Sequence, residues 1–252
     1  MSVYACSDLH GMLHFYKAIK EHLSPEDKVF FLGDAGDRGP HCWETIKAIL
    51  DDPQFIYLRG NHEAMLCDAL DEYICYGHPE YHSMNLLSMN GGDSTFEEAI
   101  ADQKLDYYYR KLARLDTLRE YTNTSGERIV LCHAGFTPWK EDFFADDEEK
   151  KDIVFRQPSW RDILWDREHF LDEWTMEDCV DCFIVHGHTP VPYLLDEIDP
   201  ACLIDEIEPG ALTYCGDRKI CIDTGAVFTG ICVLLDLDTW DEHIFTSEPY
   251  MT

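Results

Sequence analysis

Short apolar runs alternate with amphipathic stretches in the first part of the chain, and this rhythm limits the fold more than any other feature of the sequence. The strand-like runs are residues 3–6, 28–32 and 55–58, and the helix-like stretches are residues 13–23, 42–50 and 63–73. An alternation of strands and helices predicts a largely parallel sheet with helices on its faces. In a sheet of this kind, functional side chains gather just beyond the carboxyl ends of the strands.

The rest of the chain departs from that order. We interpret residues at about 74–127 as a helical cap or insertion beside the site, with Leu112, Leu115 and Leu118 at helical spacing. The later strand-like runs are 128–132, 182–185, 219–222, 231–235 and 243–246. The last three are rich in β-branched and aromatic residues, which favours antiparallel strands of a second sheet. The expected fold is therefore α/β, a β-sandwich of mixed sheets flanked by helices, in a single domain spanning residues 1–252 with a helical insertion.

Five short polar motifs each follow the end of a predicted strand. They are Asp8-Leu9-His10-Gly11, Gly33-Asp34-Ala35-Gly36-Asp37-Arg38-Gly39, Gly60-Asn61-His62-Glu63, His133-Ala134-Gly135 and His186-Gly187-His188-Thr189. A lone Asp-x-His pair is a weak signal. Three charged side chains directly after an apolar strand, as in the second motif, need a reason to be there, because burying charge is costly. All five motifs in this order indicate a functional site.

The side chains in these motifs suggest metal binding. The candidate ligands are Asp8, His10, Asp34, Asn61, His133 and His188. Asp8 and His10 are two residues apart at a strand exit, so both side chains can point the same way. Carboxylate, amide and imidazole ligands together suit Mn, Fe, Zn or Ni better than a thiolate zinc site or an all-oxygen calcium site.

With these motifs the chain resembles the phosphoprotein-phosphatase branch of the calcineurin-like metallophosphoesterases, and within it the bacteriophage lambda type with its bacterial relatives. The resemblance extends from Asp8 to about Leu235. The strings at 59–63, 164–168 and 222–228 also resemble this branch, whereas the central insertion matches poorly apart from the sequence at 90–92. Ser7 stands where the family usually has glycine.

The resemblance implies a centre of two divalent metal ions, with Mn²⁺ expected first and Fe, Zn or Ni as alternatives. Asp8 and His10 would bind the first metal, and Asp34 would bridge it to the second. Asn61 and the two histidines His133 and His188 would complete the second metal's protein ligands. A water or hydroxide between the metals would attack phosphorus, because coordination makes it a nucleophile at neutral pH.

The resemblance also assigns the remaining polar side chains of the motifs. His62 would be the general acid that protonates the leaving oxygen, and Asp37 would fix its ring. Arg38 and Arg167 would bind the phosphoryl oxygens. Arg59 would be a third phosphate-binding group, or else a structural partner. His186 is left open between a plain structural role and a role in or behind the ligand set.

Composition narrows the partners of the chain. Its 50 acidic residues against 20 basic ones give a net charge of -30, which argues against binding to nucleic acid or to an anionic membrane. The eleven cysteines lie mostly in apolar runs, which fits buried thiols in a reducing cytosol. Cys179 and Cys182 form one C-x-x-C pair without a second pair at zinc-ribbon spacing. No secretory signal and no apolar stretch of ~20 residues is present, so a cytoplasmic protein is expected.

The leading hypothesis is a metal-dependent Ser/Thr protein phosphatase that acts on a phosphoprotein or a small phosphoester. One alternative is a hydrolase that splits diadenosine tetraphosphate, or another dinucleoside polyphosphate, symmetrically. A second alternative is a catalytically silent scaffold, although the complete set of candidate ligands argues against it. The physiological substrate, the oligomeric state and a bacterial or phage origin stay open.

Overall fold

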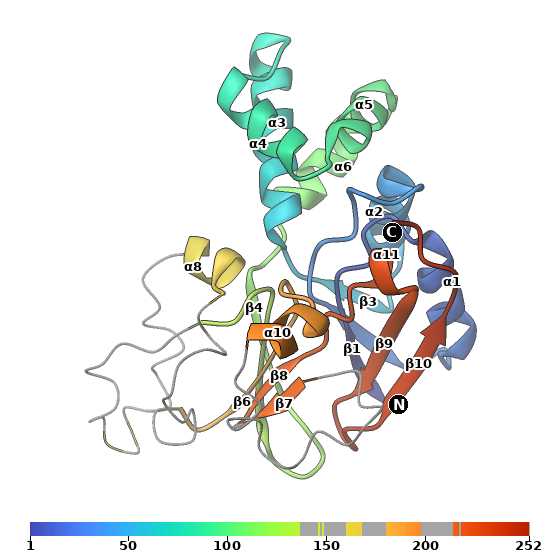
Figure 1. Cartoon of the computed structure of the whole chain (residues 1–252), viewed down its shortest axis with the longest axis vertical. Coiled ribbons are helices and arrows are strands. Elements are labelled where there is room, and N and C mark those ends of the chain that lie inside the picture. The colour runs from blue at the N-terminus through green and yellow to red at the C-terminus, as the bar shows by residue number, and fades with distance from the viewer. Residues whose placement is uncertain are drawn as a thin grey trace.

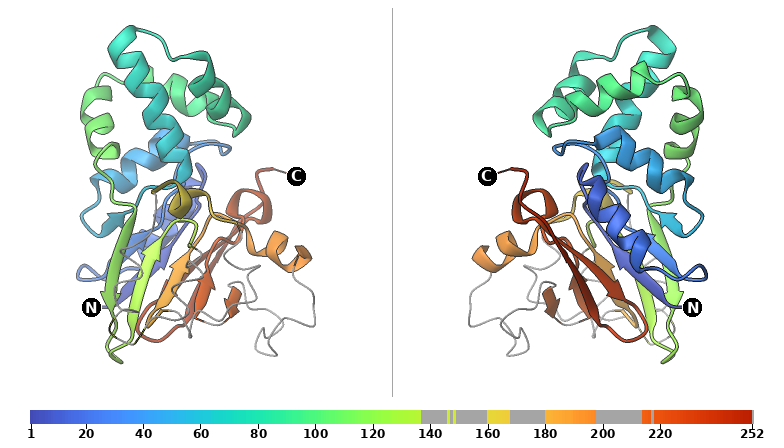
Figure 2. Two further views of the ribbon diagram at one scale, coloured as in Figure 1. Left: turned by 90° about the vertical axis from the view of Figure 1, so that its left-hand side faces the viewer. Right: turned by 90° about the vertical axis from the view of Figure 1, so that its right-hand side faces the viewer.

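Ten strands form two sheets in the part of the chain that the computed structural model describes, which is residues 1–136, 146, 148, 160–167, 180–197, 214–216 and 218–251. The first sheet contains β1 (Val3–Cys6), β2 (Lys28–Phe31), β3 (Phe55–Tyr57), β9 (Ile231–Asp236) and β10 (Glu242–Thr246). The second contains β4 (Leu118–Thr122), β5 (Arg128–Cys132), β6 (Phe183–His186), β7 (Tyr214–Gly216) and β8 (Lys219–Cys221). Their orders are β10-β9-β1-β2-β3 and β4-β5-β6-β8-β7. Figure 2 shows the two sheets from opposite sides of the sandwich.

Helices connect and cover these strands. They are α1 (Leu13–His22), α2 (Cys42–Asp51), α3 (Asn61–Tyr76), α4 (Tyr81–Met89), α5 (Asp93–Ala101), α6 (Leu105–Leu112), α8 (Trp160–Trp165), α10 (Val191–Glu197) and α11 (Ala226–Thr229). The order β1-α1-β2-α2-β3-α3 confirms the predicted alternation, and β1 pairs with β2, and β2 with β3, in parallel. In the described part of the chain, no helix has both the length and the apolarity that crossing a membrane requires.

Strict alternation along the strands divides the core into layers. In β1, Val3 and Ala5 pack into the apolar layer between the sheets, whereas Tyr4 and Cys6 face the layer beneath the helices. β5 does the same in the second sheet, with Ile129 and other residues turned inward. Since successive side chains of a strand point to opposite faces, a strand buried on both sides is apolar throughout. The sandwich therefore fixes the strand ends firmly.

The structure corrects two expectations for individual elements. The C-terminal strands β9 and β10 do not join the second sheet, because β9 pairs antiparallel with β1 and extends the first sheet. Of the three predicted C-terminal runs, β8 alone enters the second sheet, where it runs parallel to β6. The helical spacing that included Leu118 is also wrong, since Leu118 begins β4 and pairs with Cys132 of β5.

Helices α4, α5 and α6 account for most of residues 81–112, the segment that follows α3. They lie with the outer part of α3 above the sandwich in Figure 1. Contacts link α3 to α4, and α2 to both α5 and α6. This helical segment therefore packs beside the strand ends at which the polar motifs lie.

Candidate active site

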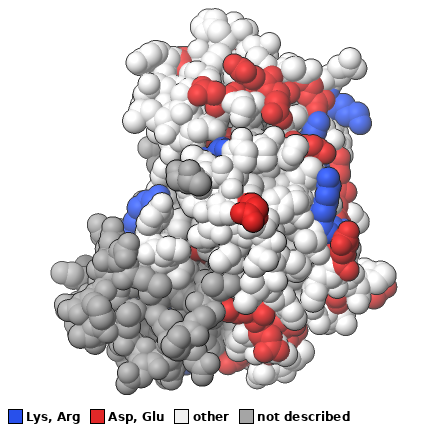
Figure 3. All heavy atoms as spheres, turned by 45° about the vertical axis from the view of Figure 1, so that its right-hand side comes forward, with Lys and Arg blue, Asp and Glu red and all other residues white. Residues whose placement is uncertain are grey.

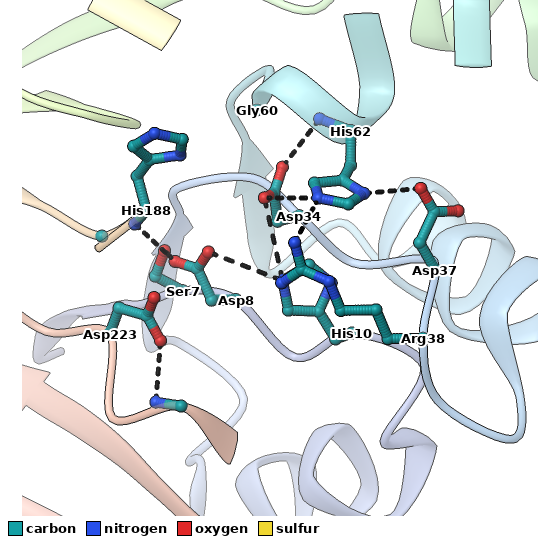
Figure 4. Close-up of polar contacts among 12 residues, drawn as sticks. Ser7, Asp8, His10, Asp34, Asp37, Arg38, Gly60, His62, His188 and Asp223 are labelled. Carbon is teal, nitrogen blue, oxygen red and sulfur yellow. Dashed lines mark hydrogen bonds and ion pairs between the residues drawn. The ribbon is translucent and has the colours of Figure 1, made fainter. Parts of the chain in front are cut away.

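Six of the eight non-glycine residues with positive φ in the described part of the chain are predicted site residues. They are Asp8, His10, Asp34, Asp37, Arg38 and His188, with φ between 42° and 70°. The left-handed region is costly for residues with a Cβ atom, and residues held there gather at functional sites. Each lies in a turn or loop that follows a strand, and Figure 4 shows the six side chains gathered at one site.

Asp34 lies at the centre of this site. Its Oδ2 atom is 3.8 Å from Nε2 of His10, 3.8 Å from Nε2 of His62 and 3.4 Å from Nε2 of His133. Its other carboxylate oxygen accepts the backbone N–H of His62 at 3.0 Å. Burial raises the pKa of Asp34, but the imidazoles, His133 first, outweigh it and hold that pKa well below its usual value. Asp34 therefore lies within reach of histidines on both sides of the site, and its role as a bridge between two cations stays a prediction.

One group of candidate ligands surrounds Asp34 on the side of β1. His10 donates from Nδ1 to the carbonyl of Gly36 at 2.9 Å. In the neutral ring, Nε2 is therefore unprotonated and turns its lone pair toward the site. Arg38 donates to that nitrogen at 2.7 Å. Asp8 lies 3.9 Å from the same nitrogen through Oδ1, a buried oxygen without a hydrogen-bond partner among the described residues. Burial raises the pKa of Asp8 to about 6.

A second group lies on the side of the second sheet. Oδ1 of Asn61 is 2.8 Å from Nε2 of His133 and 3.1 Å from Nδ1 of His188. The candidate ligand atoms of Asp34, His133 and His188 all lie within 4.8 Å of one another, as do those of Asp34, His10 and His62. Both groups share Asp34.

His133 gives a direct test of whether cations fit. Its Nδ1 donates to the carbonyl of Leu32 at 2.8 Å, so in the neutral ring Nε2 would turn a lone pair toward the oxygens of Asn61 and Asp34. Burial opposes a charged ring, yet the Asp34 carboxylate raises the pKa of His133 to about 10. The ring therefore faces two acceptors that need a positive charge between them. A divalent cation satisfies that need as well as a proton does.

His62 and Asp37, which the sequence predicts to be the acid pair, are hydrogen-bonded to each other. Nδ1 of His62 donates to Oδ2 of Asp37 at 2.5 Å, and Nε2 accepts from Arg38 at 2.9 Å. The hydroxyl of Thr95, on α5, donates to the other oxygen of Asp37 and accepts the Asp37 backbone N–H at 3.1 Å. Thr95 is not among the residues that the sequence predicts for the site. The signal that could have found it is its position just after the Asn90-Gly91-Gly92 turn, the one part of the insertion that resembles the family.

Glu63 supports the turns from behind. Its carboxylate accepts the backbone N–H groups of Asp34 at 2.8 Å, Ala35 at 3.0 Å and Gly60 at 2.9 Å. It also accepts the hydroxyl of Tyr57 at 2.7 Å. A single buried carboxylate thus joins the second and third strand ends. The sequence contained Glu63 in a motif but offered no role for it.

Two side chains beside Asp8 also escaped prediction as site residues. The hydroxyl of Ser7 donates to Oδ2 of Asp8, so this departure from the family contacts a candidate ligand. A Cβ atom on Gly187 would lie 2.1 Å from both of those oxygens, which explains the glycine there. Burial, followed by the charge of Asp8, raises the pKa of Asp223 well above its usual value, and Figure 4 shows Asp223 near Asp8.

The remaining predicted residues differ in where they lie. Arg167 is exposed and donates to the hydroxyl of Thr189 at 3.3 Å, next to His188. Arg59 instead donates to the carbonyl of Leu112 at 3.1 Å, at the end of α6, which favours the structural alternative. His186 is buried and belongs to neither group of candidate ligands, and burial lowers its pKa to about 3. Cys179 lies outside the described residues.

Residues 1–215 match the calcineurin-like phosphoesterases, and the chain belongs to this family of metal-dependent hydrolases. It is 24% identical to the asymmetrical bis(5'-nucleosyl)-tetraphosphatase PrpE of Bacillus thuringiensis over 242 residues, covering 88% of this chain and 85% of the relative. The fold matches a structure solved as a candidate diadenosine tetraphosphatase, with a TM-score of 0.58, 14% identity and coverage of 98% and 94%. A protein serine/threonine phosphatase from Saccharomyces cerevisiae matches with a TM-score of 0.56, 13% identity and coverage of 98% and 80%.

These similarities confirm the α/β sandwich and the calcineurin-like family. The narrower expectation, the phosphoprotein-phosphatase branch and its lambda type, stays a prediction, because the relative from Bacillus thuringiensis is by name a tetraphosphatase.

Proposed function

We propose that the chain is a two-metal phosphoesterase whose six ligands are Asp34 and the five candidate side chains around it. Asp8 and His10 would hold one cation, Asn61 with His133 and His188 the other, and Asp34 both. The unpartnered buried oxygen of Asp8 and the acceptors around His133 support this assignment. The bound ions would supply an activated water and neutralise phosphate charge. The mixed oxygen and nitrogen ligands suit Mn²⁺ first, with Fe, Zn or Ni as alternatives.

The charged side chains of the chain would perform the remaining steps. Arg38 now donates to Nε2 of both His10 and His62. A phosphate at the site would take the two N–H groups of Arg38, because a guanidinium matches phosphoryl oxygens. Nε2 of His62 is then free to carry a proton toward the leaving oxygen, while Asp37 keeps the proton on Nδ1. Arg167, at the rim, would bind a further phosphoryl oxygen.

The acid pair carries our proposal for the substrate, a phosphoserine or phosphothreonine ester. An alkoxide is a strong base and must be protonated as it leaves, whereas a nucleotide phosphate leaves readily as an anion. A buried pair in which Asp37 is held by Thr95 is therefore most useful for a poor leaving group.

We also infer a cytoplasmic protein, because seven of the eight free cysteines whose side chains are described are buried thiols.

The His62→Asn variant tests this proposal through the leaving group. It should keep both metals yet lose about 10²–10⁴-fold in turnover of a phosphoserine peptide, the usual contribution of a general acid. It should lose much less on p-nitrophenyl phosphate, whose leaving group needs little protonation. His82→Asn, at an exposed histidine of α4, is the matched control and should keep full activity. Equal losses on both substrates would contradict the role of His62, and inactivity of the wild type with every metal would favour the scaffold.

A second candidate is hydrolysis of dinucleoside polyphosphates, which the tetraphosphatase relatives favour. Product analysis on diadenosine tetraphosphate distinguishes its two forms. Two nucleoside diphosphates mean symmetrical cleavage, whereas a triphosphate and a monophosphate mean the asymmetrical cleavage named for the relatives. Turnover of the dinucleotide well above that of the phosphoserine peptide would replace our leading proposal with this one.

A further inference from the structure

A hollow of about 700 Å³ lies between α2, β3 and α6, and none of the candidate metal ligands, acid-pair residues or phosphate-binding arginines lines it. Its floor is apolar and includes Ile49 of α2, Phe55 of β3 and Leu115, of which the first two are buried. Tyr107 of α6 also lines it and leaves 49% of its surface exposed. Concave sites of this volume with apolar walls and a few polar groups are typical of small-molecule binding.

Two arginines at this hollow have no described partner of opposite charge. Arg110 and Arg114 both line it and are exposed, and no ion pair of either is found among the described residues. Figure 3 shows that acidic side chains outnumber basic ones on the face it presents, and the whole chain has 50 acidic residues against 20 basic ones. None of the carboxylates among the described residues neutralises Arg110 or Arg114, so both guanidinium groups are available to an anionic ligand.

The other charged residues at the hollow do not neutralise the positive charge of the two arginines. Lys111 is already bound to Asp51 at 2.7 Å and to the carbonyl of Leu50 at 2.8 Å. Asp106 is the one acidic residue among those that line the hollow. The helix dipole favours basic residues in the last turn of α6 and so accounts for Arg110. It does not account for Arg114, which lies beyond the end of the helix.

The arginines can act on one ligand. Ala113, which follows α6, keeps the right-handed helical conformation, so Arg114 follows Arg110 by about one turn on the same side. Two guanidinium groups so placed match the oxygens of a phosphate. The apolar floor matches a flat organic group, as does the part of the Tyr107 ring that Lys111, 4.8 Å from its centroid, leaves open.

We propose that this hollow binds a nucleoside monophosphate, with its phosphate on Arg110 and Arg114 and its base against the apolar floor beside Tyr107. The site is separate from the metal-ligand groups around Asp34. The proposal therefore does not depend on which phosphoester the active site hydrolyses. The probe is AMP, added to the purified full chain and followed by isothermal titration calorimetry.

The wild type should bind AMP saturably, and the Arg110→Ala/Arg114→Ala variant should bind it at least tenfold more weakly, because charge-assisted hydrogen bonds are lost. The Lys17→Ala/Lys104→Ala variant removes two exposed cations outside the hollow and should leave the affinity unchanged. Inorganic phosphate alone should bind at least tenfold more weakly than AMP. Circular dichroism checks that each variant is folded, and the two single arginine variants replace the double one if it is not.

Three results would overturn the proposal. The first is an AMP affinity that the arginine variants leave unchanged, which would place the nucleotide elsewhere, including the active site. The second is the absence of saturable binding at millimolar AMP. The third is equal affinity for AMP and inorganic phosphate, which would mean that the apolar floor takes no part.

Discussion

At the scale of single residues, the acid pair depends on a side chain from a distant part of the chain. Thr95 is fully buried, and its hydroxyl makes hydrogen bonds with both the carboxylate and the backbone N–H of Asp37. Thr95 therefore fixes the direction in which Asp37 meets His62, although it touches neither the candidate ligands nor the substrate position.

We predict that Thr95→Val lowers kcat on a phosphoserine peptide by roughly tenfold or more, because both hydrogen bonds between the hydroxyl and Asp37 are lost, with little change in KM. Valine keeps the shape of threonine but cannot hold Asp37. Thr95→Ser should restore most of the activity, and the metal content of both variants should equal that of the wild type. A lower metal content, or a change in KM without a change in kcat, would mean that Thr95 acts only through the fold.

The residues that could be predicted from the sequence are those whose chemistry is local to a strand end. Asp8 and His10 are two residues apart, and each of the other candidate ligands follows its own strand, so the topology alone brings them together. Thr95 and the bonds of Glu63 could not be predicted, because they depend on how the helical segment packs. The choice between the two roles of Arg59 could not be made from the sequence for the same reason, since its partner, Leu112, lies in α6.

At the scale of elements, the start of α5 is packed directly against the acid pair. Gly92 is its N-cap, and a Cβ atom there would lie 2.3 Å from Leu87 and 2.9 Å from a carboxylate oxygen of Asp37. The glycine has an ordinary negative φ of -93°, so space and not backbone conformation requires it. The backbone of this turn also bonds the site, because Arg38 donates its N–H to the carbonyl of Gly91 at 3.1 Å.

Gly92→Ala should therefore lower both stability, by about 1–3 kcal/mol, and turnover, because the new methyl group displaces Asp37. Gly126→Ala is the informative comparison. Nothing lies within 4 Å of a Cβ atom there, but φ is +85°, so alanine costs about 1 kcal/mol through the backbone alone. Chemical denaturation with parallel assays should show a loss of stability in both variants and a loss of activity only in Gly92→Ala. Full activity of Gly92→Ala would show that α5 does not position the pair.

Element types were easier to predict from the sequence than element neighbours. The pattern of β9 identifies a buried strand, but periodicity does not say which strand it pairs with, and β9 joins β1 and not the second sheet. Leu118 was assigned to a helix because its spacing from Leu112 and Leu115 fits one. Pairing with β5 decides otherwise, since a half-buried edge strand can carry the same leucine.

At the scale of the whole molecule, the metal-free site keeps the imidazole of His133 protonated, and this makes folding stability depend on pH. In the metal-free chain the pKa of His133 is about 10, above its ordinary 6.5, so the folded state holds this proton more tightly than the unfolded state. The resulting stabilisation is complete below pH 6.5 and is lost progressively as the pH rises toward 10.

We expect His133 to cost the metal-free protein up to about 1.4 kcal/mol of stability per pH unit between pH 6.5 and 8.5. This change corresponds to several degrees in Tm. Mn²⁺ should raise Tm more at pH 8.5 than at pH 6.5, because metal binding displaces the proton from His133. Thermal scans of the wild type and of His133→Asn test this, and an equal pH dependence in both would contradict it.

A descendant of this chain that no longer needed the reaction would be free to relax the turns at its strand ends. Non-glycine residues in the left-handed region cost the folded state roughly 1–2 kcal/mol each, and glycine removes most of that cost. Six such residues meet at one site. After the loss of catalytic activity, substitutions to glycine or asparagine at these turns would therefore accumulate before the apolar layers changed. A catalytically silent relative would be recognisable because few non-glycine residues at these turns would have positive φ.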